Sequence, residues 1–207
     1  MTPIEHSDYK YIKSLVQRYD INNKEILSLA SGSCNEEFLF SEIGKNKVKC
    51  IDISFSEPMG DYVGFDEAIA RLDKEVISVQ DFKDCKQYDV IYTNSPGDWM
   101  NTPVSHCKII PDDYRRIFDT NAKEKCLLIV QLRGGEYKAA VLNDKIFQIH
   151  LMNQIATETS KLQFRELWML GDGGKIMIIV AANYDLEPSE IVIEEVEKIG
   201  HPFKKIF

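Results

Sequence analysis

The chain has 207 residues, of which 44% are hydrophobic and 28% are charged, and its formal net charge is −8. This length predicts one globular domain over residues 1–207, and the acidic balance argues against a nucleic-acid partner. No apolar run approaches the roughly 20 residues that span a bilayer, and the first ten residues lack a signal-peptide core. The 5 cysteines are widely spaced without a CxxC pair, so we expect no disulfide framework, no structural zinc and a cytoplasmic protein with reduced thiols.

The first half of the chain alternates between patterns typical of helices and of strands. A predicted amphipathic helix over Ile4–Tyr19 precedes a short apolar run, Ile26–Ala30, which is typical of a buried parallel strand. A helix should follow at once, with Asn35 or Ser33 as its N-cap and Gly44 as its C-terminal stop. The next predicted elements are a strand over Lys47–Ile53, a loop over Ser54–Gly64, a short helix over Phe65–Leu72, and strands over Val76–Val79 and Tyr88–Thr93.

The second half continues this alternation and ends in a hairpin. A helix should begin at Pro111-Asp112-Asp113, because proline suits the first turn and carboxylates suit the positive end of the helix dipole. The elements predicted after it are a strand over Cys126–Leu132, a helix over Lys138–Ser160, strands over Leu162–Leu170 and Lys175–Asn183, and a helix over Pro188–Ile199. The glycine-rich link Gly171–Gly174 makes the last two strands antiparallel. The predicted fold is α/β: a doubly wound, mostly parallel seven-stranded sheet with an antiparallel terminal hairpin.

This order of elements resembles the class I S-adenosylmethionine-dependent methyltransferases, a Rossmann-like family, from Lys24 to Tyr184. The segment Leu29–Cys34, which reads LASGSC, looks like the first glycine-rich motif of the family. Asp52 looks like its ribose-binding acid at the end of the second strand, about 20 residues beyond the turn. Asp81-Phe82 follows the predicted third strand, where the family has its adenine-contacting pair.

The resemblance extends to the fourth strand and implies a cofactor. Tyr88–Ile91 matches the approach to that strand, which Asn94 ends. The family differs at two positions: it usually has an acid where this chain has Ser28, and a glycine where this chain has Cys34. The implied cofactor is S-adenosyl-L-methionine, and the residues that the resemblance assigns to it are Ala30, Ser31, Gly32, Ser33, Asp52, Ile53, Asp81, Phe82 and Asn94.

The charge around the predicted turn favours the same cofactor independently. A dinucleotide needs several glycines so that backbone amides can approach its pyrophosphate at a helix N-terminus. Here the turn contains only Gly32, and Glu36-Glu37 place two carboxylates at the start of the next helix. Such carboxylates repel a pyrophosphate but suit a positively charged sulfonium. The pattern therefore favours S-adenosylmethionine over NAD, although Asp52 could also be only a capping residue.

The segment after the fourth strand contains the candidate catalytic residues. Asn94-Ser95-Pro96-Gly97 distantly resembles the Asn-Pro-Pro-aromatic motif of methyltransferases that act on planar amines and amides. In that motif the asparagine holds the acceptor nitrogen. Asp98 and His106 are the nearest candidate bases, which a hydroxyl acceptor would need. Each could instead be an ordinary loop residue.

The leading hypothesis is a methyltransferase that acts on a small-molecule acceptor at oxygen or nitrogen. A second is a non-catalytic relative of the same fold that binds a metabolite or a protein partner, and Ser28 and Cys34 motivate it. A third is a nicotinamide-dependent oxidoreductase, which the missing glycines disfavour. The sequence predicts no nucleic-acid or membrane partner, and it leaves the methyl acceptor and the oligomeric state open.

Overall fold

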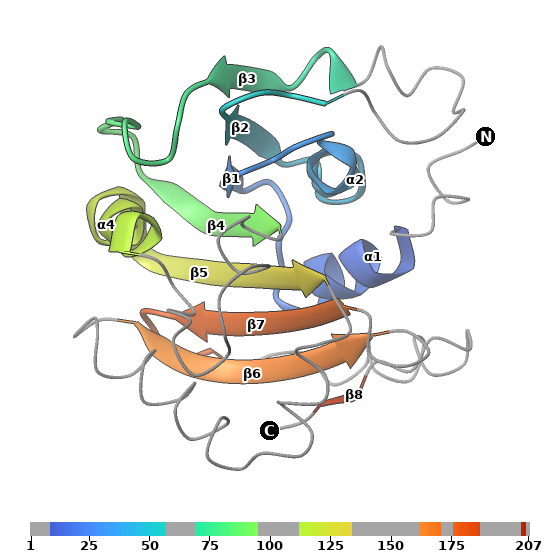
Figure 1. Cartoon of the computed structure of the whole chain (residues 1–207). Coiled ribbons are helices and arrows are strands. Elements are labelled where there is room, and N and C mark those ends of the chain that lie inside the picture. The colour runs from blue at the N-terminus through green and yellow to red at the C-terminus, as the bar shows by residue number, and fades with distance from the viewer. Residues whose placement is uncertain are drawn as a thin grey trace.

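The computed structural model describes residues 9–56, 69–94, 112–133, 162–170, 176–186 and 204–205. Within these residues the chain forms one eight-stranded sheet of order β3-β2-β1-β4-β5-β7-β6-β8 (Figure 1). The strands are β1 (Glu25–Leu29), β2 (Lys47–Asp52), β3 (Asp73–Val76), β4 (Tyr88–Asn94), β5 (Ala122–Arg133), β6 (Gln163–Leu170), β7 (Ile176–Ala182) and β8 (Lys204–Lys205).

The strand directions confirm the predicted fold class. Strands β3, β2, β1, β4 and β5 are mutually parallel. Strand β7 lies antiparallel between β5 and β6, so the predicted terminal hairpin is present. The seven predicted strands are joined by a two-residue β8 at the edge beside β6, which the sequence did not predict. The reversal of strand order between β1 and β4 places a crevice at the carboxyl ends of these strands, where ligands of such sheets bind.

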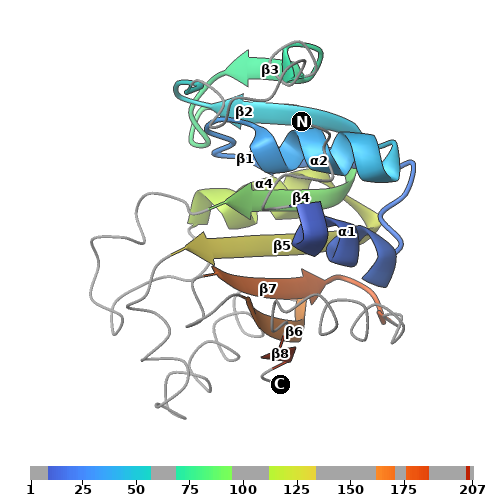
Figure 2. The same ribbon diagram turned by 90° about the vertical axis from the view of Figure 1, so that its right-hand side faces the viewer.

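Helices cover both faces of the sheet. Helices α1 (Tyr9–Arg18) and α2 (Asn35–Gly44) lie on one face, and α4 (Asp112–Asn121) lies on the other (Figures 1 and 2). The apolar residues of α1 recur at helical spacing and are buried, as an amphipathic helix requires. They join α2 and the sheet in one cluster that includes Leu15, Phe40 and Tyr92. Within the described residues, no helix is both long and apolar enough to cross a membrane.

Two predicted boundaries are wrong. The third strand covers Asp73–Val76, not Val76–Val79, because the charged segment DKEV forms the outer strand beside β2. Charged side chains suit an edge strand, so hydrophobicity alone placed this strand too late. Strand β5 also begins four residues before the predicted start at Cys126, at Ala122.

The predicted caps of α2 are also wrong in part. The N-cap is Cys34, with φ of 61° and no side-chain capping hydrogen bond, rather than Asn35 or Ser33. The helix does end at Gly44, but Lys45 adopts the left-handed conformation there. Glycine is required at position 44 for a steric reason, because a Cβ atom there would lie 2.3 Å from both the Asn46 side chain and the Ile21 carbonyl oxygen.

The predicted helices Lys138–Ser160 and Pro188–Ile199 and the link Gly171–Gly174 lie outside the described residues, as does the first half of Phe65–Leu72.

Candidate functional site

The turn between β1 and α2 has an unusual backbone. Ala30, Gly32 and Cys34 have φ of 56°, 54° and 61°, so every second residue is in the left-handed region. Each non-glycine residue in this region costs about 1–2 kcal/mol. A Cβ atom built on Gly32 would meet no atom of the described residues within 4 Å. The turn therefore exposes its backbone to open space at Gly32, which leaves room for a ligand to approach closely.

Asp52 fixes this turn from the neighbouring strand. The Gly32 amide donates to Asp52 Oδ2 at 2.8 Å, and the Ser54 amide donates to Asp52 Oδ1 at 3.0 Å. The Ser31 amide also donates to the Ile51 carbonyl oxygen at 3.2 Å. The ends of β1 and β2 are thus joined at one place, as the sequence predicted from their parallel arrangement. Ile53, the next residue, is 71% exposed and presents an apolar surface beside the carboxylate.

A second polar network lies at the ends of β4 and β5. Asn94 Nδ2 donates to Glu36 Oε1 at 2.9 Å, and Gln131 Nε2 donates to Asn94 Oδ1 at 3.1 Å. The Tyr92 hydroxyl donates to Gln131 Oε1 at 2.8 Å, and the Tyr11 hydroxyl donates to Glu36 Oε1 at 3.2 Å. Asn94 is the half-buried member of this network. Its amide plane is therefore held from two sides at the rim of the crevice.

Glu36, Gln131 and Tyr11 are the members that the sequence analysis did not assign to the site. In the sequence Glu36 stands out only as a charge at the start of a helix, although two adjacent acids before an apolar helix face indicate a functional position. Gln131 was a polar residue in an otherwise apolar strand, and it is fully buried. A buried amide of this kind needs polar partners. Tyr11 carried no signal, because its spacing is that of an ordinary core residue.

A third polar cluster lies beneath the turn. The Ser31 hydroxyl lies 3.0 Å from Ser28 Oγ, and the Ser28 hydroxyl donates to Glu37 Oε1 at 2.5 Å. Burial, followed by the nearby Glu36 and Cys34, raises the pKa of the Glu37 carboxyl well above its ordinary value. The hydrogen bond from Ser28 opposes this rise only partly. Glu37 is therefore favoured as a neutral acid in the folded protein.

The buried thiols of Cys34 and Cys50 lie beside the same cluster. Their mutual hydrogen bond is the largest cause of a lowered pKa for Cys34 and of a raised pKa for Cys50. Within the described residues, no group of three or more His, Cys, Asp or Glu side chains could hold a metal ion.

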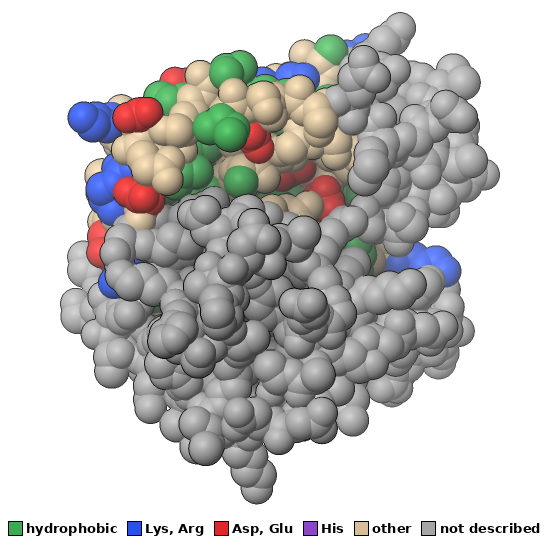
Figure 3. Space-filling model, in the orientation of Figure 1, with side chains coloured by type: hydrophobic (Ala, Val, Ile, Leu, Met, Phe, Trp, Pro, Cys, Tyr) green, Lys and Arg blue, Asp and Glu red, His purple; other side chains and the backbone are tan. Residues whose placement is uncertain are grey.

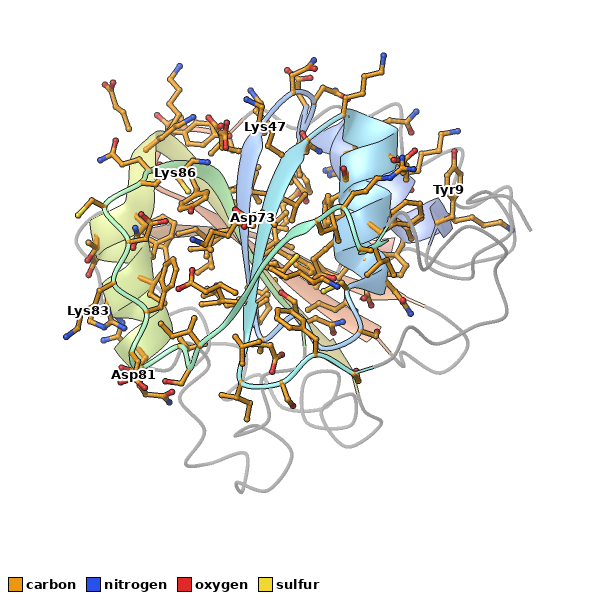
Figure 4. All side chains as sticks on the ribbon, turned by 90° about the horizontal axis from the view of Figure 1, so that it is seen from above. Tyr9, Lys47, Asp73, Asp81, Lys83 and Lys86 are labelled. Atoms are coloured by element: carbon orange, nitrogen blue, oxygen red, sulfur yellow. The ribbon has the colours of Figure 1, made fainter. Side chains whose placement is uncertain are left out.

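Asp81 and Phe82 lie toward the α4 side of the crevice. Figure 4 shows Asp81 at the carboxyl-end edge of the sheet, opposite Lys47 and Lys86. The Asp81 carboxylate accepts a hydrogen bond from the Ser78 hydroxyl at 2.6 Å. The Phe82 ring is 2% exposed and packs in the core, so this ring does not line the crevice here. Asp98 and His106, the candidate bases, lie outside the described residues.

The crevice side of the molecule is acidic. Figure 3 shows Asp and Glu side chains gathered near the centre of this face. The carboxylates that the hydrogen bonds place at the crevice are Asp52 and Glu36. A separate cavity of about 510 Å³ opens near the start of β4 and β5, beside Asp89 and Lys125. That cavity is therefore distinct from the crevice.

Comparisons with known proteins agree with this geometry at the level of the fold. No protein-family model matches the sequence, and no curated protein matches it. Among solved structures, the 1,6-didemethyltoxoflavin-N1-methyltransferase of Burkholderia thailandensis, with bound S-adenosylhomocysteine, is 11% identical with a TM-score of 0.57, covering 88% of this chain and 80% of its own.

Two further structures show the same similarity. The glycopeptide N-methyltransferase MtfA, complexed with sinefungin, is 10% identical over 86% of this chain and 94% of its own, with a TM-score of 0.58. The ribosomal protein L11 methylase of Lactobacillus delbrueckii subsp. bulgaricus is 13% identical over 84% of this chain and 76% of its own, with a TM-score of 0.53. The chain therefore has the Rossmann-like fold of the class I S-adenosylmethionine-dependent methyltransferases.

Proposed function

We propose that the chain is an S-adenosylmethionine-dependent methyltransferase that acts on a small-molecule acceptor, at oxygen or nitrogen. The observation that carries the proposal is the turn at Gly32, which is open in front of its backbone among the described residues and is fixed by a hydrogen bond to Asp52. The similar structures support the proposal, because their fold is shared and two of those described above hold S-adenosylhomocysteine or sinefungin. We also propose a cytoplasmic location, on the pattern of cysteines alone.

The residues around the turn fit such a cofactor. The turn from Ala30 to Ser33 would lie against its amino-acid part, and Asp52 would accept hydrogen bonds from the ribose hydroxyls. The exposed Ile53 would pack against the adenine. Asp81, with the backbone of Phe82, would approach the adenine edge from the α4 side. The nearby carboxylates favour a sulfonium and disfavour a pyrophosphate.

Asn94 is the described residue that would meet the methyl acceptor. S-adenosylmethionine supplies an electrophilic methyl group, and the protein mainly has to align the acceptor atom with it. Glu36 and Gln131 hold the Asn94 amide in one orientation. The remaining hydrogen-bonding capacity of this amide could orient an acceptor hydroxyl or amine. Asp98 and His106 remain our proposed bases for removing the acceptor proton.

Calorimetric titration with S-adenosylhomocysteine tests the proposal directly. We expect the wild-type protein to bind it and Asp52→Asn to weaken the affinity by about 10- to 100-fold, because a hydrogen bond to a charged group contributes about 1.5–3 kcal/mol. Asp73→Asn is the matched control, since Asp73 is an exposed acid on the neighbouring strand. It should bind like the wild type.

The alternative functions predict other results. If the wild type gives neither heat nor a shift in melting temperature at millimolar S-adenosylhomocysteine, the proposal is wrong. An enhancement of NADH fluorescence would then favour a nicotinamide-dependent enzyme. Binding of neither cofactor would leave the non-catalytic metabolite- or protein-binding relative as the better reading.

A further inference from the structure

The hydrogen-bonded chain Ser31–Ser28–Glu37 joins three separate elements beneath the turn. Ser31 belongs to the turn, Ser28 to β1 and Glu37 to α2. The three side chains are 3%, 0% and 0% exposed. The two bonds measure 3.0 and 2.5 Å, and the Ser31 hydroxyl also lies 3.2 Å from the Ser28 carbonyl oxygen. A carboxyl group from the helix is thus connected to the turn through two hydroxyls.

Burial of the Glu37 carboxyl is unfavourable for folding in itself. Its second oxygen, Oε2, is buried and has no hydrogen-bond partner in the described part of the chain. A buried polar atom in this state destabilises the folded protein. The residues that follow on the helix, from Phe38 to Phe40, are all apolar and buried. For stability alone an apolar side chain would suit this position better, which indicates that the carboxyl has a role in fixing the neighbouring turn.

The group that it holds is a strained turn. Ala30 and Cys34 flank Ser31–Ser33 and both have positive φ without being glycine. Such residues stay in the left-handed region only where the surrounding structure fixes them. Asp52 fixes the turn from the crevice side, through the Gly32 amide. The Ser31 hydroxyl contributes to fixing it from the core side, where the Cys34 thiol also contacts Cys50.

We propose that Glu37 is a positioning residue of this turn: through Ser28 and Ser31, its carboxyl keeps the backbone in the conformation that leaves Gly32 open to a ligand. Glu37 does not touch the ligand. Strand β1 has a serine rather than an acid at residue 28, and the helix supplies the carboxyl in its place. The proposal rests on the proposed function, because it takes the adenosyl cofactor as the ligand of the turn.

Three variants on one helix test it by calorimetric titration with S-adenosylhomocysteine. Glu37→Met keeps the length of the side chain but cannot accept the bond from Ser28, and we expect it to weaken binding by about tenfold, the equivalent of about one hydrogen bond. Glu37→Gln keeps an acceptor oxygen and should bind nearly as tightly as the wild type. Glu42→Met is the control, because Glu42 is exposed on the same helix.

A double-mutant cycle separates positioning through Ser28 from a general loss of packing. Ser28→Ala should weaken binding by about the same factor as Glu37→Met, and the double variant should be little worse than either single variant, because residues of one network are not additive. Ser31→Ala serves as the second variant if Glu37→Met does not fold. It removes the hydroxyl through which the turn is connected to Ser28 and Glu37, and it should also weaken the binding of S-adenosylhomocysteine.

The outcomes distinguish this proposal from the proposed function. If the wild type does not bind S-adenosylhomocysteine, both proposals are wrong. If the wild type binds it, and a folded Glu37→Met or Ser31→Ala variant binds equally well, only the positioning role is wrong. Equal losses for Glu37→Gln and Glu37→Met would also overturn it, because rescue by the glutamine oxygen is then missing.

Discussion

The pair formed by Arg18 and Glu166 is buried, so removing one partner alone should destabilise this fold strongly. Arg18 Nε donates to Glu166 Oε2 at 2.8 Å, and a second guanidinium nitrogen donates to Oε1 at 2.7 Å. The Tyr19 hydroxyl donates to the same carboxylate at 2.5 Å. The two charged side chains are 4% and 3% exposed. The pair joins the end of α1 to β6 across the sheet.

Glu166→Gln should therefore destabilise the protein strongly. The amide keeps the shape of the side chain but removes the negative charge that faces the buried guanidinium, and breaking a buried pair in this way costs about 3–5 kcal/mol. For a chain of this size each kcal/mol lowers the melting temperature by about 2–4 °C, so the expected fall is about 6–20 °C. Urea unfolding followed by circular dichroism measures the free energy, and a calorimetric scan measures the melting temperature.

A pair with one fully exposed partner provides the control. Arg165 lies 3.1 Å from Asp185, whose side chain is fully exposed, so Asp185→Asn should leave the urea midpoint unchanged. The double variant Arg18→Met/Glu166→Leu should recover most of the loss of Glu166→Gln, because apolar residues of similar size replace buried ion pairs well. A loss below about 1 kcal/mol for Glu166→Gln would refute the reasoning, since the guanidinium would then be solvated in some other way.

Three further changes have effects of predictable sign. Glu37→Gln should stabilise the protein relative to the wild type, and the gain should grow as the pH rises above 4.5, because burial raises the pKa of the carboxyl in the folded protein above that value while the carboxyl of the unfolded chain ionises. Urea midpoints from pH 5 to 8 measure this gain, and a difference between variant and wild type that does not change with pH would contradict it. Ala30→Gly should stabilise the folded protein by about 0.5–1 kcal/mol, because glycine adopts the left-handed conformation without strain, although the greater backbone entropy of the unfolded chain offsets part of this gain. A lower urea midpoint for the variant would contradict this prediction. Gly44→Ala should destabilise by several times that amount, because its Cβ would lie 2.3 Å from Asn46 Nδ2 and from the Ile21 carbonyl oxygen; circular dichroism melts measure the loss, and an unchanged melting temperature would refute the clash.

The sheet could be predicted where its strands are buried on both faces. Strands β1, β4 and β5 lie inside the sheet, so their apolar runs marked them in the sequence. Strand β3 lies at the edge and its residues are charged, so the apolar residues after it were taken for the strand. The pattern of hydrophobicity therefore located the interior of the sheet and misplaced its border.

The candidate site could be predicted only where strand ends define it. Parallel strands bring their carboxyl ends together, which is why the turn and Asp52 were expected to meet, and the Gly32 amide does bond to Asp52. The contact between Glu36 and Gln131 joins residues 95 positions apart. No local pattern contains such a pair, because it depends on where the fold places the start of α2 relative to β5. The same holds for the hydrogen bond between the side chains of Ser28 and Glu37, which depends on the rotation of α2 about its own axis.

The backbone of the turn adopts positive φ at residues other than glycine, in a fold that has clear structural relatives. Sequence motifs record glycine where a backbone needs positive φ, yet here Ala30 and Cys34 adopt that conformation as Gly32 does. Their strain is tolerated because Asp52 and the buried serines over-determine the turn. The path of the backbone therefore depends on these side-chain contacts and not on glycine alone.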